Sequence, residues 1–503
     1  MSFIKIKANI NLVLKLRSTA LDNIYHLDNL STKDDRNVSI QRVPKICVLA
    51  SSSRGGTAVT AELLQWQGAK CADPRGRLLT LPGEEKPHLI LAGLAYPSRD
   101  EQFDDLSEID ASTSNVSVLL DELKSEVGYP LEYCSNLELY ATQLYRRLLL
   151  QWPILLTTID MKEAIMNLTQ ALKDIFPKGY YDSLFNRRLV LEACVSCFPL
   201  IKRAFYDCRF YNTTEDVAQM TSECWSYEET PFVLPPPWQN ATVADLEQGC
   251  LLLRDPSNAW RLPFWRSVFN MQRMDIIHLI RDPRESIQGL CDGWNYAFGF
   301  QTMPSNKSLD ITGYTDNLCE GNNRWKLNRL NFSISKNLNR KLFYEHDKLS
   351  LVEVCAYQWK EAHDSIIKES ERLGLSRTVV NFSDLRENSE KTFRIICISF
   401  QLEFSKSGEL FAQSFNDNWV MVTPLARLNG YDRWKTSPFS DEIKAMFSSG
   451  YFDEVSMKLG LSNIFSYDSN KPSSDDLLKT WNSSNCLKDI ETERSANPIF
   501  YHA

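Results

Sequence analysis

Long apolar runs and an excess of basic residues are both missing from this 503-residue chain. No run approaches the roughly 20 apolar residues that span a bilayer, and the N-terminal segment lacks the apolar core of a secretory signal. The net charge is −8, which argues against nucleic acid or a sulfated polysaccharide as the main partner. We therefore expect a cytoplasmic monomer or homodimer with no membrane and no nucleic-acid partner.

Closely spaced cysteines are also scarce. The 13 cysteines are odd in number and scattered, which excludes the framework of a small disulfide-rich secreted domain. The one CxxC pair, Cys194 and Cys197, has no second Cys/His pair at zinc-site spacing. We expect reduced thiols that pack in the core, and no metal site.

The chain does contain an alternation of short apolar segments with helical patterns. Strands are predicted at 45–50, 250–256, 274–283 and 377–385, with helices at 57–67 and 351–375. This alternation predicts an α/β fold, a parallel sheet flanked by helices. The segment 76–93 is expected to form a further pair of strands.

A large helical insertion interrupts this pattern, because apolar residues recur at three- and four-residue steps from about 115 to 210. A stretch rich in Pro and Trp then forms a stiff connector. The expected organisation has five parts: an N-terminal extension at 1–42, the first half of the core at 43–114, the insertion at 115–245, the second half of the core at 246–468, and a polar tail at 469–503.

The stretch "LASSSRGGTA" joins the first strand to its helix. A loop at this place directs backbone N–H groups and the positive end of the helix dipole at one anion. Gly55 and Gly56 permit close approach, Thr57 adds a hydroxyl and Arg54 a fixed charge. No Lys precedes Thr57, so the GxxxxGK[ST] pattern of nucleoside triphosphate sites is missing. The alternative is an ordinary turn.

A second motif, "LIRDPRES", ends the strand at 274–283. Arg281 and Arg284 stand at the carboxyl end of a core strand, where open α/β sheets bind ligands, and Pro283 suits the first turn of a helix. In the alternative interpretation, the two arginines only form ion pairs with Asp282 and Glu285.

Together these segments resemble the sulfotransferases that use 3′-phosphoadenosine 5′-phosphosulfate (PAPS), in particular bacterial-like members. The resemblance implies a P-loop NTPase-like core in which the first loop holds the 5′-phosphosulfate and Arg281 the 3′-phosphate. "LLLRDPSNAW", "AYQWKEAHDSI", "VVNFSDL" and "ARLNGYDRWKTSPF" are similar to later segments of that family. The implied cofactor-binding residues are Ser53, Arg54, Gly55, Gly56, Thr57, Ala58, Arg281, Ser286, Gly289, Arg427 and Trp434.

Three positions depart from the family pattern. Gly289 stands where a phosphate-binding Ser is usual, and Ser286, one turn earlier, is the nearest hydroxyl. Ala58 replaces a second Thr, and Arg254 replaces a Lys. Trp434 either lines the adenine site or packs in the core.

In-line sulfuryl transfer needs a base for the acceptor's proton and cations for the leaving oxygen. The catalytic candidates are His88, Glu85, Glu84 and Arg254. A His titrates near neutral pH, whereas a Glu needs a raised pKa. The alternatives are that "GEEKPH" is a solvated turn and that Arg254 only pairs with Asp255.

The resemblance thus implies a PAPS-dependent sulfotransferase that transfers a sulfuryl group to a hydroxyl, with an amine as second choice, and releases adenosine 3′,5′-bisphosphate (PAP). Its acceptor is expected to be a small molecule of the secondary-metabolite type, bound at the helical insertion. The alternative is a non-catalytic nucleotide-binding or scaffold protein on the same fold.

Overall fold

The structure is a computed structural model that describes residues 40–95, 105–151, 160–181, 184–198, 234–269, 273–295, 350–404 and 431–459. The chain divides into two compact units, Met1–Lys444 and Ala445–Ala503. The second unit contains α22 (Asp453–Lys458), and α21 (Ser440–Ser448) runs across the boundary. The five parts expected from the sequence remain predictions.

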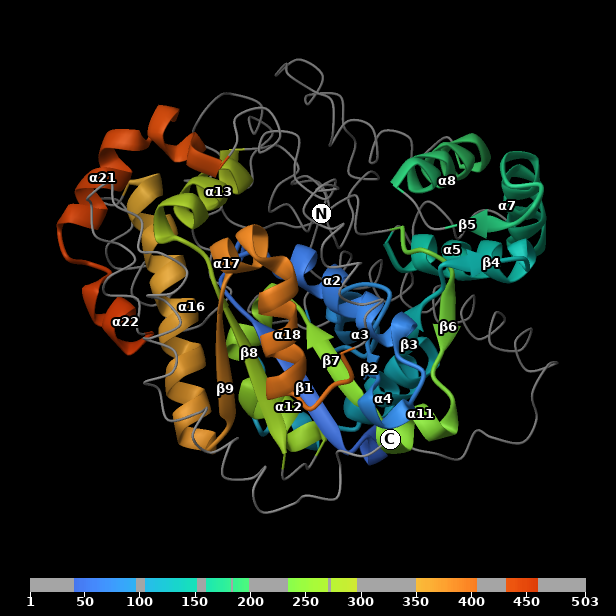
Figure 1. Ribbon diagram of the computed structural model, residues 1–503, viewed down its shortest axis with the longest axis horizontal. Coiled ribbons are helices and arrows are strands. Elements are labelled where there is room, and N and C mark those ends of the chain that lie inside the picture. Colours follow the sequence, from blue (N-terminus) through green and yellow to red (C-terminus); the bar gives the residue numbers. More distant parts are fainter. Residues whose placement is uncertain are drawn as a thin grey trace, which may run out of the picture. The chain divides into compact units, whose positions relative to one another are not determined.

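A five-stranded sheet forms the centre of the first unit, and all of its strand pairs are parallel. The strand order is β2-β7-β1-β8-β9, with helices on both sides (Figure 1). The strands are β1 (Lys45–Ala50), β2 (Leu78–Leu79), β7 (Cys250–Arg254), β8 (Met274–Ile280) and β9 (Ser376–Asn381). The predicted α/β class is confirmed, and the strands predicted at 45–50, 250–256 and 274–283 are present. The strand predicted at 377–385 is wrong in its second part, because Asn381 caps a helix that begins at Phe382.

The two faces of the sheet are buried by different helices, as alternation along β1 shows. Ile46 and Val48 belong to a core shared with α3, α4, α12 and α16, whereas Cys47 and Leu49 pack with α2, α17 and α18. These helices are α2 (Thr57–Lys70), α3 (Lys86–Leu91), α4 (Asn115–Glu126), α12 (Leu262–Val268), α16 (Leu351–Leu373), α17 (Phe382–Glu387) and α18 (Ser389–Ser399).

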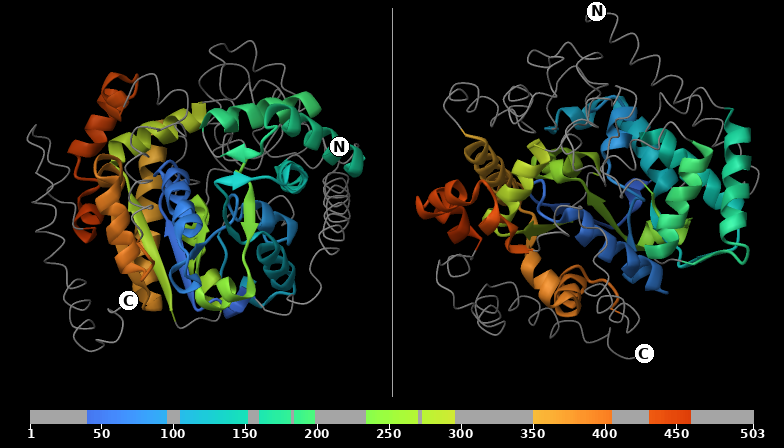
Figure 2. Two further views of the ribbon diagram at one scale, coloured as in Figure 1. Left: turned by 45° about the vertical axis from the view of Figure 1, so that its right-hand side comes forward. Right: turned by 90° about the horizontal axis from the view of Figure 1, so that it is seen from above.

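The helical insertion has its own hydrophobic core, made by α5 (Leu137–Gln151), α7 (Met161–Ile175) and α8 (Leu184–Cys197) (Figure 2). These helices lie within the stretch whose apolar spacing predicted helices, and Cys194 lies buried in this core as expected. The region also holds two small antiparallel pairs. They join β3 (Gly128–Pro130) to β6 (Trp238–Asn240) and β4 (Tyr133–Cys134) to β5 (Tyr180–Tyr181).

The prediction of a strand pair at 76–93 is wrong in its second half. Only β2 is a strand, and the segment continues into α3. Pro87 explains the difference, because its fixed φ and missing N–H suit the first turn of a helix.

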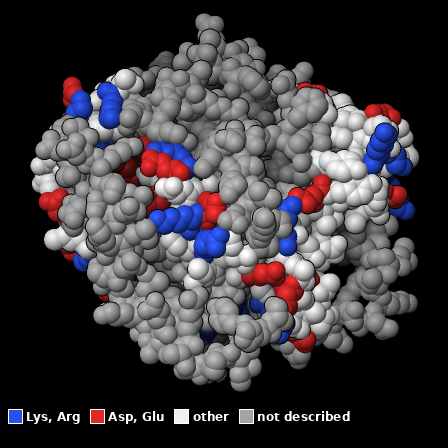
Figure 3. All heavy atoms as spheres, viewed as in Figure 1, with Lys and Arg blue, Asp and Glu red and all other residues white. Residues whose placement is uncertain are grey.

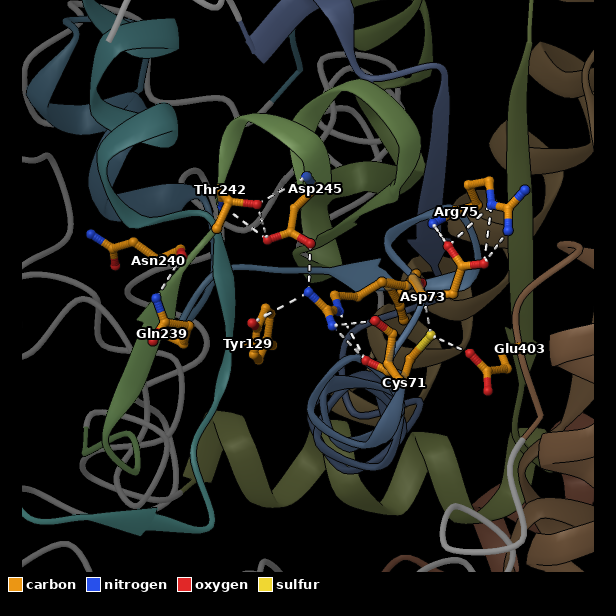
Figure 4. Close-up of polar contacts among 12 residues, drawn as sticks. Cys71, Asp73, Arg75, Tyr129, Gln239, Asn240, Thr242, Asp245 and Glu403 are labelled. Atoms are coloured by element: carbon orange, nitrogen blue, oxygen red, sulfur yellow. Dashed lines mark hydrogen bonds and ion pairs between the residues drawn. The ribbon is translucent and has the colours of Figure 1, made fainter. Parts of the chain in front are cut away.

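At the amino-terminal edge of the sheet, polar contacts fasten the end of α2 to its surroundings (Figure 4). The Cys71 thiol donates to a carboxylate oxygen of Glu403 over 2.9 Å. Asp245 accepts hydrogen bonds from Thr242 in a capping box at the start of α11 (Val243–Gln248) and pairs with Arg77. These contacts lie at the amino-terminal ends of the strands, opposite to the loops that follow the carboxyl ends of the strands.

Among the described residues, no helix combines the length and apolarity needed to cross a bilayer. On the face drawn in Figure 3, described acidic and basic side chains lie next to one another.

Two fully buried histidines join β8 to α16. His278 Nε2 and His363 Nδ1 are 2.7 Å apart, and Arg377 Nη1 lies 3.2 Å from His278 Nδ1. Because Arg377 can only donate, His278 accepts at Nδ1 and donates from Nε2 to His363. Burial lowers the pKa of His278, and it lowers the pKa of His363 to about 3. Both rings are therefore neutral in the folded protein.

These histidines should destabilise the protein in acid. Below about pH 6.5 the two histidines bind protons in the unfolded chain but stay neutral in the folded core. The free energy of unfolding therefore falls as pH drops toward 3. His363→Gln removes one such site. The variant should be less stable than the wild type at pH 7.5. This gap, the difference between their free energies of unfolding, should narrow by about 2 kcal/mol at pH 5. Urea unfolding at both pH values measures this, and a gap independent of pH would contradict it.

Candidate functional site

Four strands of the sheet end at the same edge, and the predicted site residues of both sequence motifs lie there. The parallel register pairs Leu49 with Arg254, Ala50 with His278, and Ile280 with Asn381, so the four strands end at similar heights. Directly after the strands come the loop 51–56 (after β1), Asp255 (after β7), Arg281 (after β8) and α17 (after β9). Ligands bind at this edge of open α/β sheets.

The loop after β1 has an unusual backbone. Arg54 has φ +63° and Gly56 φ +96°, both in the left-handed region. A Cβ on Gly56 would clash with the ring of Phe382, and one on Gly55 would clash with Ser51 Oγ. Both glycines are thus required by close packing, and alternating backbone conformations of this kind direct N–H groups toward a common point.

The loop also leaves polar groups available. Gly56 is the N-cap of α2, makes no side-chain capping bond, and the first turn contains no acidic residue. The hydroxyls of Ser51 and Ser52 are buried and make no hydrogen bond within the described part of the chain. Buried hydroxyls are normally paired, so these groups beside a helix N-terminus fit an anion. Ser53, Thr57 and Ala58 lie in the same loop and first turn.

Arg281 joins the second motif to this loop. Its Nη1 donates to the carbonyl oxygen of Arg54 over 3.1 Å, and its guanidinium lies 5.4 Å from the centre of the Phe382 ring. The ion pairs of the alternative interpretation are present as well, from Arg281 to Glu285 at 3.0 Å and from Arg284 to Asp282 at 2.6 Å. Arg281 therefore contacts its own helix and the loop at once.

The helix after β8, α13 (Pro283–Asn295), gives a physical reason for the glycine at position 289. A Cβ on Gly289 would lie 3.2 Å from Arg54 Cβ, so the glycine makes room for Arg54. Ser286 is fully buried, and its hydroxyl makes no hydrogen bond among the described residues. Ser286 is thus available where the sequence suggested a substitute hydroxyl.

The late loop is described only in part. Trp434 lies in η8 (Tyr431–Thr436), is 5% exposed, and its ring centre is 5.0 Å from the guanidinium of Arg284. This contact places Trp434 beside the second motif. Arg427 lies outside the described residues.

Glu85 and Arg254 meet at the end of β7. The backbone N–H of Arg254 donates to Glu85 Oε1, and Arg254 Nε donates to the carbonyl of Gly83. Glu85 is fully buried, and its Oε2 has no hydrogen-bond partner in the described ranges. Burial and the negative charge of Asp255 raise the pKa of Glu85 to about 8, against the opposing effect of Arg254.

The other predicted residues take different positions. His88 is fully buried in α3 and lies 2.8 Å from a Glu126 carboxylate oxygen, while Glu84 is partly exposed in the turn before Glu85. The interpretation of "GEEKPH" as a solvated turn is wrong, because two of its ionisable side chains are fully enclosed.

Asp255, the alternative partner of Arg254, is engaged by another cation. It lies 2.8 Å from Arg261 Nη1, and both side chains are buried. The Arg254 side chain instead donates to Gly83. Arg254 is therefore held mainly by the turn that carries Glu85.

Three contributors to the site were not predicted from the sequence. Ser51 and Ser52 were not singled out, although a run of three serines after a strand was the signal. Phe382 was recognised only as part of a strand, yet it packs against both Gly56 and Arg281. No local pattern marks such a contact between distant segments.

Comparisons of the chain with family models, with curated proteins and with solved structures each found no match. The interpretation of the site therefore depends on its geometry and on the resemblance of its motifs.

Gly56→Ala tests the packing of the loop. The left-handed φ and the contact with Phe382 should together cost about 2–4 kcal/mol of the free energy of unfolding. Gly374→Ala is the matched control, because Gly374 also has a positive φ but an added Cβ would meet nothing within 4 Å. That variant should lose only about 1 kcal/mol. Equal losses in urea unfolding would show that Phe382 does not constrain Gly56.

Proposed function

We propose that the protein is a PAPS-dependent sulfotransferase that transfers a sulfuryl group to a hydroxyl of a small molecule, or to an amine as second choice, and releases PAP. The observation that carries this proposal is the contact between Arg281 and the loop after β1. It brings a fixed cation, an uncapped helix N-terminus and unpaired buried hydroxyls to one strand edge. A ligand with two separate anionic groups suits this arrangement.

The residues present fit such a nucleotide. The N–H groups at the start of α2, with Arg54 and Thr57, would hold the 5′-phosphosulfate, while Arg281 and Ser286 would hold the 3′-phosphate. The nucleotide supplies the sulfuryl group. Trp434 lies beside Arg284 and is our candidate for the adenine site.

Glu85 is our candidate for the base. The acceptor oxygen forms a bond to sulfur as the bond from sulfur to the phosphate oxygen breaks, and the acceptor's proton passes to Glu85. A pKa of about 8 suits a general base that works in mildly alkaline solution. Arg254, 4% exposed beside Glu85, would neutralise charge on the leaving oxygen. Because Glu85 is enclosed, an acceptor must displace neighbouring side chains to reach it.

That enclosure favours a second candidate function. Both Glu85 and His88 are fully buried, as expected of a protein that keeps the nucleotide site without catalysing transfer. Binding of PAP without transfer to any acceptor would support this alternative.

Calorimetry with PAP tests the site. Arg281→Met and Arg54→Met should each weaken binding on the order of 100-fold, because each removes a charge-assisted contact to a phosphate. Arg372→Met is the control, since Arg372 lies half-exposed on α16 and pairs with Glu369. Wild-type protein that does not bind PAP, or equal binding by all three variants, would refute the proposal.

Transfer from sulfate-labelled PAPS to a panel of phenols and alcohols tests Glu85. Turnover should rise with pH to a plateau above about 8, because the carboxylate form accepts the proton. Glu85→Gln should lower turnover by at least about 100-fold while PAP binding persists. Glu369→Gln is the matched control, because Glu369 lies on α16 and pairs with Arg372. Full turnover by Glu85→Gln would remove Glu85 from the mechanism.

A further inference from the structure

The helix that carries Glu85 at its start is short and is held from the side. α3 has only six residues, Lys86–Leu91, and Glu85 is its N-cap. One turn later, His88 Nε2 lies 2.8 Å from Glu126 Oε2, and His88 is fully buried. Since so short a helix has little stability alone, this contact fixes how α3 lies and therefore where Glu85 points.

Glu126 is itself anchored to the helical insertion. It is the last residue of α4, and its other oxygen is 2.8 Å from Arg146 Nε on α5. Arg146 also donates to Ser125 Oγ over 2.6 Å and lies 3.6 Å from Glu122. A buried chain of charged groups thus runs from the insertion to the helix of the candidate base.

The contact with Glu126 also determines which ring nitrogen of His88 carries a proton. Burial alone would raise the pKa of Glu126, but the positive charge of Arg146 and the contact with His88 outweigh burial and lower the pKa. Glu126 is therefore a carboxylate, and the proton in the contact belongs to His88 Nε2, which donates.

We propose that His88, Glu126 and Arg146 form a positioning chain for Glu85, in which the contact between His88 and Glu126 holds α3 and so orients the carboxyl of Glu85. His88 donates from Nε2 to the end of α4, and its Nδ1 has no hydrogen-bond partner among the described residues, whereas Glu85 lies against the end of β7 beside Arg254. The insertion thereby contributes Arg146 to the site without contacting substrate. The role of Glu85 as a base rests on the proposed function, but the positioning of its carboxyl does not.

The titration of Glu85 itself is the readout. Because the folded state binds a proton at Glu85 up to a pH of about 8, replacing Glu85 with Gln should stabilise the protein increasingly as pH rises toward 8. For the wild type and for each variant below, thermal unfolding is compared with that of the same protein carrying Glu85→Gln across this pH range. The pH dependence of the difference gives the Glu85 midpoint, which is the pH at which Glu85 is half-protonated in the folded state. No ligand is needed, so the midpoint can be measured even where PAP fails to bind.

His88→Leu and Arg146→Met should each shift the Glu85 midpoint by at least about one pH unit, since α3 is no longer held. His88→Gln keeps an N–H donor for Glu126, so this variant should have the Glu85 midpoint of the wild type. His363→Leu is the matched control, because His363 is equally buried but lies on α16. It should lower the melting temperature and leave the Glu85 midpoint at about 8.

Two results would overturn the proposal. One is a Glu85 midpoint that stays at about 8 in both His88→Leu and Arg146→Met, which would make the positioning chain merely structural. The other is turnover that His88→Gln abolishes as completely as Glu85→Gln does, with the Glu85 midpoint unchanged, which would make His88 the acceptor. Failure of PAP to bind wild-type protein would refute the proposed function and leave the midpoint comparison valid.

Discussion

The hydrogen bond from Arg281 to the carbonyl of Arg54 is the contact on which the site depends. It joins the ends of two neighbouring strands, β1 and β8, through residues 227 positions apart in sequence. Its acceptor belongs to a residue in the left-handed conformation, and Gly289 leaves the space in which Arg54 packs. The loop, the second motif and α13 are therefore in direct contact with one another.

Burial sets the second constraint. Burial raises the pKa of Glu85 and also removes its side chain from solvent. A carboxyl with a pKa suited to proton transfer is therefore out of reach of a ligand in this structure. The neighbouring His88 is equally enclosed but committed to a carboxylate. Two ionisable residues three positions apart thus have different environments, and Arg146 of the helical insertion contacts the carboxylate that pairs with His88.

The sheet was predictable because its signals are local. Short apolar runs such as 45–50 and 274–280 are buried on both faces, and the glycines and arginines of the two motifs stand directly after them. The helix at Lys86–Leu91 was missed because a short apolar segment after a turn has no clear period, and only Pro87 marked it. The partners of His88 and Gly56 could not be predicted, because Glu126 and Phe382 are distant in sequence. Burial of Glu85, which decides its chemistry, is likewise a property of the fold alone.

A crystal structure of the protein with PAP would test the two-anion site without any intermediate assumption. We predict one nucleotide at the carboxyl edge of the sheet, with its 5′-phosphate against the N–H groups at the start of α2 and its 3′-phosphate against Arg281. PAP bound elsewhere, or bound at this edge with Arg281 turned away from both phosphates, would contradict this assignment.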